Sequence, residues 1–130
     1  MAYLSWKDLD FNFNSTSLKS YLRSLDGLGL HCVKEDFQPA GVTMPTPQDT
    51  GLRTQDDVVA VFEADGGASG PNVKCALGTS ATMTITYGTG LSKTGTFWVS
   101  DVEPQMDAAH NHFLQVTFTA TGTITEDLTT

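Results

Sequence analysis

Alternation of apolar and polar residues predicts a strand near each end of the chain, over residues 3–14 and 114–121. The apolar positions are Leu9, Phe11 and Phe13 in the first segment and Leu114, Val116, Phe118 and Ala120 in the second. A period of two places every second side chain on the same face, so each segment is expected to be a strand with one buried face.

Three further strands are predicted in the middle of the chain. Residues 58–62 form a continuous β-branched and apolar run, which is typical of a central strand. Further on, Met83, Ile85 and Tyr87 alternate with threonine, and a turn over residues 88–95 leads into the apolar segment 97–100. These last two segments are expected to form a hairpin.

A period of 3.6 residues predicts a first short helix after the opening strand. Its apolar positions are Leu18, Tyr21, Leu22 and Leu25, spaced i, i+3, i+4 and i+7. This spacing places all four on one side of a helix, which a Ser or Thr would cap and which Gly27 and Gly29 would end.

A second short helix is predicted from its capping residues. Residues 69–72 contain Pro71 near the first helical position, and Gly78 lies just past the expected end. The inner face of this helix is expected to carry Val73, Ala76 and Leu77.

Residues 38–57 are expected to form a long loop or an extended hairpin. The segment contains three prolines, two glycines and many small polar residues, with few apolar positions. Segments of this length without regular structure are uncommon inside compact domains and usually carry a function. We therefore expect this arm to reach a partner.

The chain of 130 residues is expected to be one mainly β domain over residues 1–130, without internal repeats or a linker. The predicted architecture is an antiparallel sandwich or a partly closed barrel, with one short flanking helix and the arm. Fourteen of the 52 residues from Thr79 onward are threonine, which suits a strand face exposed to water or to another subunit.

Charge and hydropathy exclude several classes of protein. Seven Lys and Arg against fifteen Asp and Glu give a net charge of −8, and the cations are scattered between Lys7 and Lys93. Tight binding of nucleic acid needs several clustered cations, so it is not expected. No apolar run approaches the roughly 20 residues of a membrane-spanning helix.

Residues 1–7 lack the basic and apolar regions of a secretory signal, so synthesis inside the cell is expected. Cys32 and Cys75 are then expected to be free thiols, with a disulfide between them as the alternative.

Asp107, His110 and His112 are the strongest candidates for a metal site or a catalytic base. A zinc site needs three or four ligands, and His31 and the cysteines show no matching spacing. We therefore favour solvated loop residues over a site. The letters His-Asn-His also name a nuclease motif, but that motif needs residues dispersed over a ββα unit.

Other candidates have equally plain interpretations. Residues 66–70 are glycine-rich and precede a helix, but no Lys followed by Ser or Thr completes a phosphate loop, so a turn is expected. Cys32 and Cys75 lack a catalytic neighbour. The acidic pairs Glu35-Asp36 and Asp56-Asp57 are expected to be solvated, or to line an assembled surface. No catalytic, cofactor-binding or metal-binding residue is assigned, and no cofactor is expected.

In the order of its segments, the chain resembles the major tail tube proteins of long-tailed, siphovirus-type bacteriophages. No single motif carries the resemblance, which spans most of the chain except residues 103–112. The matching segments are Asn14 to Leu25, Thr50 to Arg53 before the strand from Val58 to Phe62, the turn from Asp65 to Gly67, Met83 to Gly88, and Val116 to Thr125.

This resemblance implies a structural virion protein that is not an enzyme. It implies copies assembled into hexameric rings, which stack into the tail tube and join their sheets around a channel for DNA. It also implies contacts with terminator, tape measure and tip proteins, after synthesis in the cytoplasm of a bacterial host. Sheet edges that are a hazard in a monomer would become joints in a ring.

Two alternatives from other classes remain open. One is a capsid decoration or head–tail joining protein, which is also β-rich and acidic. The other is a carbohydrate-binding β-sandwich in which Trp6, Trp98 and Tyr87 offer stacking surfaces, although these aromatic residues also suit a core. Enzymatic functions come last.

Overall fold

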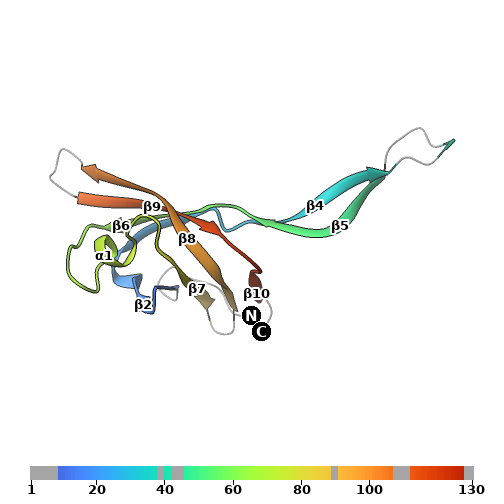
Figure 1. The fold of residues 1–130 in the computed structure, drawn as a ribbon. Helices are drawn as coiled ribbons and strands as arrows, with labels where there is room; N and C mark the ends of the chain where they lie inside the picture. The colour runs from blue at the N-terminus through green and yellow to red at the C-terminus, as the bar shows by residue number, and fades with distance from the viewer. Residues whose placement is uncertain (1–8, 38–39, 42–45, 89–90, 107–111, 128–130) are drawn as a thin grey trace.

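The computed structural model describes residues 9–37, 40–41, 46–88, 91–106 and 112–127 (Figure 1). Strands dominate it. In chain order the elements are β1 (Asp10–Phe13), β2 (Thr16–Ser17), a 3₁₀ turn (Lys19–Tyr21), β3 (Leu22–Asp26), β4 (Leu30–Phe37), β5 (Thr46–Gln55), β6 (Val58–Glu63), α1 (Pro71–Lys74), β7 (Ser80–Gly88), β8 (Leu91–Met106), β9 (His112–Ala120) and β10 (Thr125–Asp127).

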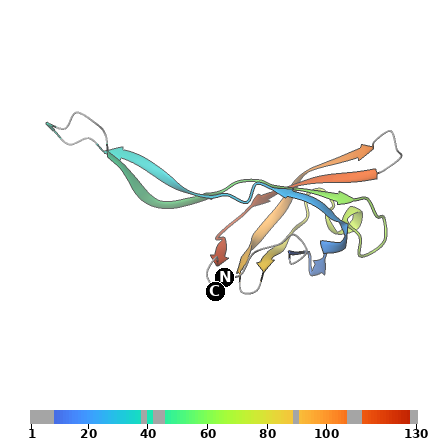
Figure 2. The same ribbon diagram turned by 180° about the vertical axis from the view of Figure 1, so that it is seen from behind.

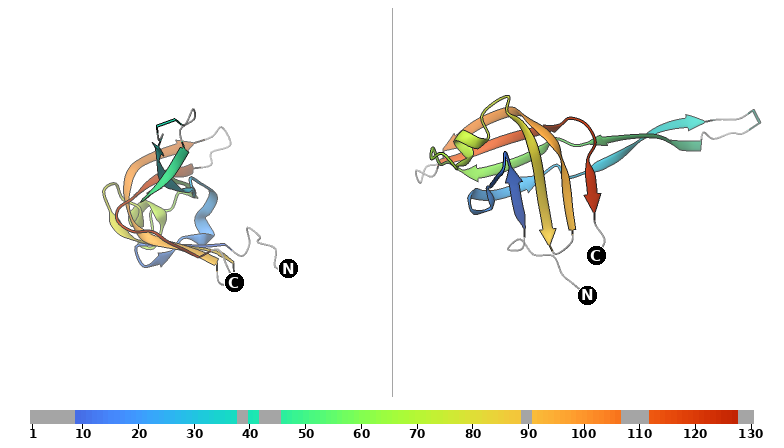
Figure 3. Two further views of the ribbon diagram at one scale, coloured as in Figure 1. Left: turned by 90° about the vertical axis from the view of Figure 1, so that its right-hand side faces the viewer. Right: turned by 60° about the horizontal axis from the view of Figure 1, so that its bottom comes forward.

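The main sheet is antiparallel and strongly curled. Its strand order is β2-β1-β7-β8-β9-β6-β3, and β10 pairs separately with β8. The long strand β8 holds this arrangement together, because its first half pairs with β7 and β10 and its second half pairs with β9. Figure 3 shows that the sheet bends around into a half-barrel, with α1 at one end. The expectation of a mainly β, partly closed barrel is confirmed.

The core fills the concave side of the curled sheet. Every second residue of the alternating strands points into it, including the fully buried Phe97, Val99 and Val116. At its centre, the Phe11 ring lies 5.6 Å from Phe62 and 5.7 Å from Phe118. Phe11 and Phe62 belong to strands that three other strands separate in the sheet order, so these rings meet only because the sheet curls.

The first predicted helix is wrong, although its apolar residues do face the core. Only a 3₁₀ turn forms at residues 19–21, and Leu22–Asp26 is strand β3, paired with β6. Leu22 pairs with Phe62 and Ser24 with Val61, so Arg23 is an extra residue in a bulge. A bulge turns the i, i+2 spacing of a strand into i, i+3. The spacing of Leu22 and Leu25 therefore fits a bulged strand as well as a helix, and pairing with β6 favours the strand.

The second predicted helix is present as the single turn α1, with Pro71 at its start and Gly78 in the left-handed conformation past its end. Its predicted inner face is wrong. Val73, Ala76 and Leu77 are exposed, whereas Pro71 and Cys75 are buried. The buried pair, Pro71 at the first helical position and Cys75 directly after the helix, is spaced i, i+4, so a different side of the turn faces the core.

The predicted turn over residues 88–95 is also partly wrong, because strand β8 already begins at Leu91. Residues 92–94 are paired on both sides, with β7 and with the short strand β10. At its other end, β8 continues to Met106 through a segment that the sequence left unassigned. The strands predicted at 58–62, 83–87 and 114–121 are confirmed as β6, β7 and β9, which ends at Ala120. β1 lies within the first predicted strand, whose residues 3–8 are outside the described part.

Replacing Phe118 by alanine is expected to lower the free energy of unfolding by about 3–5 kcal/mol, because its ring contacts Phe11 and Phe13 at the centre of the core. Leu77→Ala is the matched control. Leu77 is 69% exposed, and the change is expected to cost no more than about 0.5 kcal/mol. Urea unfolding followed by circular dichroism measures both losses of stability. Equal losses would contradict the placement of Phe118 in the core and Leu77 on the surface.

Candidate assembly interface

The arm is the β4–β5 hairpin, residues 30–55, which projects away from the half-barrel (Figure 2). The two strands pair with each other and form a sheet of their own. The prediction of an extended hairpin is confirmed, but its first strand begins at Leu30, before the predicted segment. Along the arm, the described side chains from His31 to Thr54 are exposed, and Leu52 is 63% exposed. A two-stranded ribbon without a covered face is marginally stable alone.

The second strand of the arm contains a bulge that an ion pair closes. Cys32 pairs with Arg53, and Lys34 pairs with Asp49, so β5 carries two extra residues at this point. The Arg53 guanidinium donates to both carboxylate oxygens of Asp49, at 2.9 and 3.0 Å. These bonds, together with the Gly51 amide at 2.9 Å, hold the pKa of Asp49 below its usual value. The bulge twists the ribbon and blunts its edge.

The arm root consists of residues 27–30 and 55–57, where the β3–β6 pair of the main sheet passes into the β4–β5 pair. The two strands cross here at very close range, because a Cβ atom on Gly27 would lie 1.9 Å from the carbonyl oxygen of Asp57. Gly27 also has φ +77°, so both the close contact and the backbone conformation exclude a side chain at this position. The Asp56 amide donates to the Gly29 carbonyl at 2.9 Å and continues the pairing.

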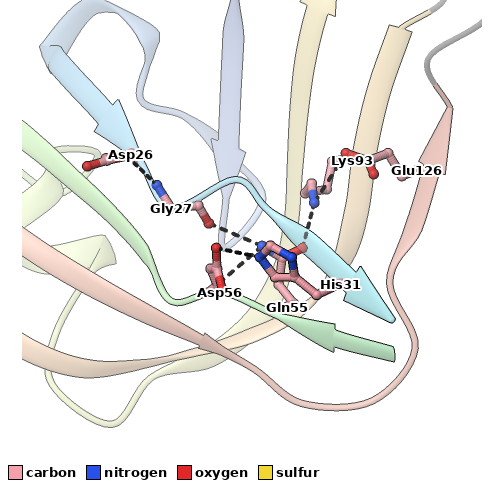
Figure 4. A network of polar contacts seen from close by, with 7 residues as sticks. All are labelled: Asp26, Gly27, His31, Gln55, Asp56, Lys93 and Glu126. Carbon is pink, nitrogen blue, oxygen red and sulfur yellow. Dashed lines mark hydrogen bonds and ion pairs between the residues drawn. The ribbon is translucent and has the colours of Figure 1, made fainter. Parts of the chain in front are cut away.

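A buried lysine lies beneath the arm root. Lys93 on β8 has a fully buried side chain, and its ammonium donates to Gln55 Oε1 at 2.5 Å and pairs with Glu126 Oε1 at 3.2 Å (Figure 4). Gln55 in turn donates from Nε2 to the carbonyl oxygens of Gly27 and Asp56, at 3.2 and 3.1 Å. Burial, reinforced by the charge of Glu126, raises the pKa of Tyr87 to about 12. One network thus joins the arm, the barrel wall and β10.

A groove of about 540 Å³ lies beside this network, between the arm and the connection from β9 to β10. Its walls combine apolar and polar residues. The lining residues are Leu30, Gly51, Leu52, Arg53, Thr54, Gln55, Ala120, Gly122, Thr123 and Ile124. Both sides of the groove are therefore attached to Lys93, one through Gln55 and the other through Glu126.

Several strand edges are open in the described part of the chain, and two of them belong to β3 and to the second half of β8. β3 is the last strand of the main sheet and pairs with β6 alone. The segment of β8 from Asp101 to Met106 pairs with β9 on one side only. Met106 is 72% exposed, and Pro104 removes one backbone donor from this edge. Open edges can pair with another chain.

The residues that the sequence offered as candidates for metal binding or catalysis do not come together in one site in the described part of the chain. His112 begins β9 with an exposed side chain, whereas Asp107 and His110 lie outside the described residues. Within the described ranges, no group of three or more His, Cys, Asp or Glu could hold a metal ion. In the glycine-rich turn the Gly67 amide donates to Asp65 Oδ1 at 2.9 Å, so this amide is already bonded.

The remaining candidates lie on separate parts of the fold. Asp56 lies at the arm root with its carboxylate 3.0 Å from His31 Nε2, and Asp57 is exposed beside it. Glu35 and Asp36 belong to β4, with side chains outside the described part. Trp98 is 40% exposed, Tyr87 packs against the core, and Trp6 lies outside the described residues.

No helix in the described part is long and apolar enough to span a membrane.

No protein-family model matches this sequence, and no curated protein matches it. Its fold does match solved structures. One is a chain from the tail of an empty GTA particle, determined by helical refinement with C6 symmetry, with a TM-score of 0.75, 8% identity, and coverage of 96% of this chain and 99% of that chain. Another is a chain from the virion of a native gene transfer agent (GTA) particle. It matches with a TM-score of 0.73 and 9% identity, over 96% of this chain and 99% of that chain.

This chain has the fold of these tail and virion chains. Because the coverage is nearly complete in both directions, the half-barrel and the arm belong to one shared architecture. The fold implied by the resemblance to tail tube proteins is confirmed.

Sequence reasoning missed Lys93, which it placed in a turn. The signal was present, because Lys93 lies an even number of residues before the inward-facing Phe97 and Val99. A charged residue in the apolar row of a strand indicates a buried partner. That partner, Glu126, lies in a polar segment without strand periodicity, so the pair could not be matched.

The two cysteines are expected to differ sharply in reactivity. Cys32 is exposed on the arm, whereas Cys75 is buried in the core, and burial raises the pKa of its thiol to about 12. Because the thiolate is the reactive form, a disulfide reagent at pH 8 should modify Cys32 and leave Cys75 intact until the protein unfolds. Cys32→Ser should remove the fast reaction and Cys75→Ala should keep it. Fast modification of both thiols would contradict the described packing.

Proposed function

We propose that this protein is a structural subunit of a phage-like tail, in which copies of the chain form rings that stack into a tube around the path of DNA. The observation that supports this most strongly is the match to a tail chain over 96% of this chain and 99% of that one. The C6 symmetry of that tail leads us to propose six copies in each ring.

The arm and the open edges are the proposed contacts between copies. The described side chains of the arm from His31 to Thr54 are exposed, so a partner chain is expected to bury surface that the half-barrel does not cover. The edges of β3 and of β8 from Asp101 to Met106 offer unpaired backbone groups for sheet extension. Because the arm and the two edges are different surfaces, contacts between them are heterologous, which is the type that closes rings.

The charges fit a channel that does not retain DNA. Several cations of the described residues are already paired with carboxylates, among them the pairs Arg23–Glu63, Arg53–Asp49 and Lys93–Glu126. The net charge of −8 also repels a polyanion. In this proposal the protein is not an enzyme and uses no cofactor. It is made in the host cytoplasm and contacts other tail proteins at the ends of the tube.

Replacing residues 31–54 by Asn-Gly is expected to abolish assembly and leave the half-barrel folded. Leu30 and Gln55 are a register pair, so a two-residue turn can join them, and Gln55 keeps its bond to Lys93. Negative-stain microscopy of the concentrated intact protein should show rings or tubes of constant width, and the variant should show none. Circular dichroism and cooperative unfolding provide the folding control.

The opposite outcomes separate this function from its alternatives. An intact protein that stays monomeric or trimeric at millimolar concentration would favour a decoration or joining protein. Tubes formed by the armless variant would refute the role of the arm while leaving the tail function standing.

The protein is not expected to retard duplex DNA at about 0.15 M salt, since it presents no cluster of cations to replace phosphate counterions. A variant with Asp101→Lys and Glu103→Lys adds two exposed cations to β8 and serves as a sensitivity control. Its retention at low salt should rise and should disappear as salt is added. Clear retention of the unmodified protein at 0.15 M salt would contradict a passive channel.

A further inference from the structure

Lys93 is a buried cation with two partners in its own chain, Gln55 and Glu126. Its side chain is inaccessible to solvent, and its partner Glu126 retains only 20% exposure. Burial of an ammonium group is costly unless it is paired and hydrogen-bonded, and an apolar side chain often serves stability as well. Stability alone therefore does not account for a lysine at this position, and the segments that its ammonium group holds in place do.

The partners of Lys93 come from two elements that do not pair with each other. Gln55 is the last residue of the arm strand β5, and Glu126 is the central residue of β10. The Gln55 amide passes the connection on to both crossing strands of the arm root, through the carbonyls of Gly27 and Asp56. One ammonium group thus links the arm root to β10.

A second feature of β8 is also fitted to β10. Gly95 lies two residues after Lys93, and a Cβ atom there would approach Ile124 Cδ1 to 2.3 Å. Ile124 comes directly before β10 and packs against the core. Two positions of β8 with the same parity, one a lysine and one a glycine, therefore accommodate the same C-terminal segment. β10 itself has only three residues, paired with Ser92, Lys93 and Thr94.

We propose that Lys93 is a positioning residue that couples β10 to the arm, so that the arm keeps a fixed direction only while β10 is paired with β8. Gly27 and Gly29 supply the point about which the arm turns when Gln55 loses its partner. A copy that binds in the groove beside the arm root contacts both coupled elements, and this consequence alone rests on the proposed function. The coupling itself is a property of the single chain.

The test uses the exposed Cys32 on β4 as the attachment site for a fluorescent dye, since Cys75 is buried. In dilute, monomeric protein, Lys93→Met should lower the dye anisotropy, because the arm gains freedom. Amide hydrogen exchange at the arm root, including Asp56, should accelerate about tenfold or more, as the loss of a charge-assisted hydrogen bond predicts. The core amides of β7 and β9 should change less.

Glu126→Gln is the decisive variant, because Glu126 belongs to β10 and is linked to the arm root through Lys93. It keeps the shape of the side chain and removes the charge, and it should reproduce the anisotropy and exchange changes of Lys93→Met in smaller degree. Arg23→Gln is the matched control. It removes the exposed Arg23–Glu63 pair of β3 and β6, close to the arm root in sequence, and should leave the arm unchanged.

The outcomes are separable from those of the assembly experiment. If Lys93→Met fails to fold, Glu126→Gln and Gln55→Leu decide the question. A folded Glu126→Gln protein whose arm shows unchanged anisotropy and exchange would overturn the coupling. A failure of the intact chain to form rings, with the coupling present in the monomer, would count against the proposed function alone.

Discussion

The curl of the main sheet depends on the contact of four phenylalanine rings across its concave side. Phe11 and Phe13 extend from β1, whereas Phe62 and Phe118 lie on β6 and β9, and their ring centres are 4.9 to 5.7 Å apart. A flat sheet would keep these strands well apart, because neighbouring strands are spaced by about 4.8 Å. Burying the rings therefore forces the half-barrel, and it directs the threonine-rich rows of β7 and β9 to the opposite face.

A sheet that closes only halfway leaves features that it cannot bury. The pairing of β3 with β6 runs out of the core and continues through the arm root as β4 and β5, where no second layer covers the ribbon. The same closure leaves β3 as an open edge. These exposed elements are costly for a solitary chain and useful for a polymer, which links the shape of the core to the proposed tail function.

The parts of the fold that the sequence predicts are those in which one periodicity persists over a whole element. β1, β7 and β9 alternate cleanly, β6 is a continuous β-branched and apolar run, and all four are predicted. β3 was missed because the bulge at Arg23 imitates helical spacing, and β4 because its residues show no regular alternation of apolar and polar side chains in the sequence. The arm as a hairpin could be anticipated from its prolines and glycines. Its root could not, since the crossing depends on contacts between distant segments.

The network under the arm root shows why stability alone does not explain these residues. A buried lysine and a glycine in a strand are each less stabilising than an apolar residue in the same place. Lys93 and Gly95 nevertheless lie at two consecutive same-parity positions of β8, and both fit the C-terminal segment, through Glu126 and Ile124. Apolar packing would tolerate several positions of β10, whereas an ammonium shared by Glu126 and Gln55 requires one. The arm is then held in one direction through Gln55. A repeating assembly needs the same arm direction in every copy.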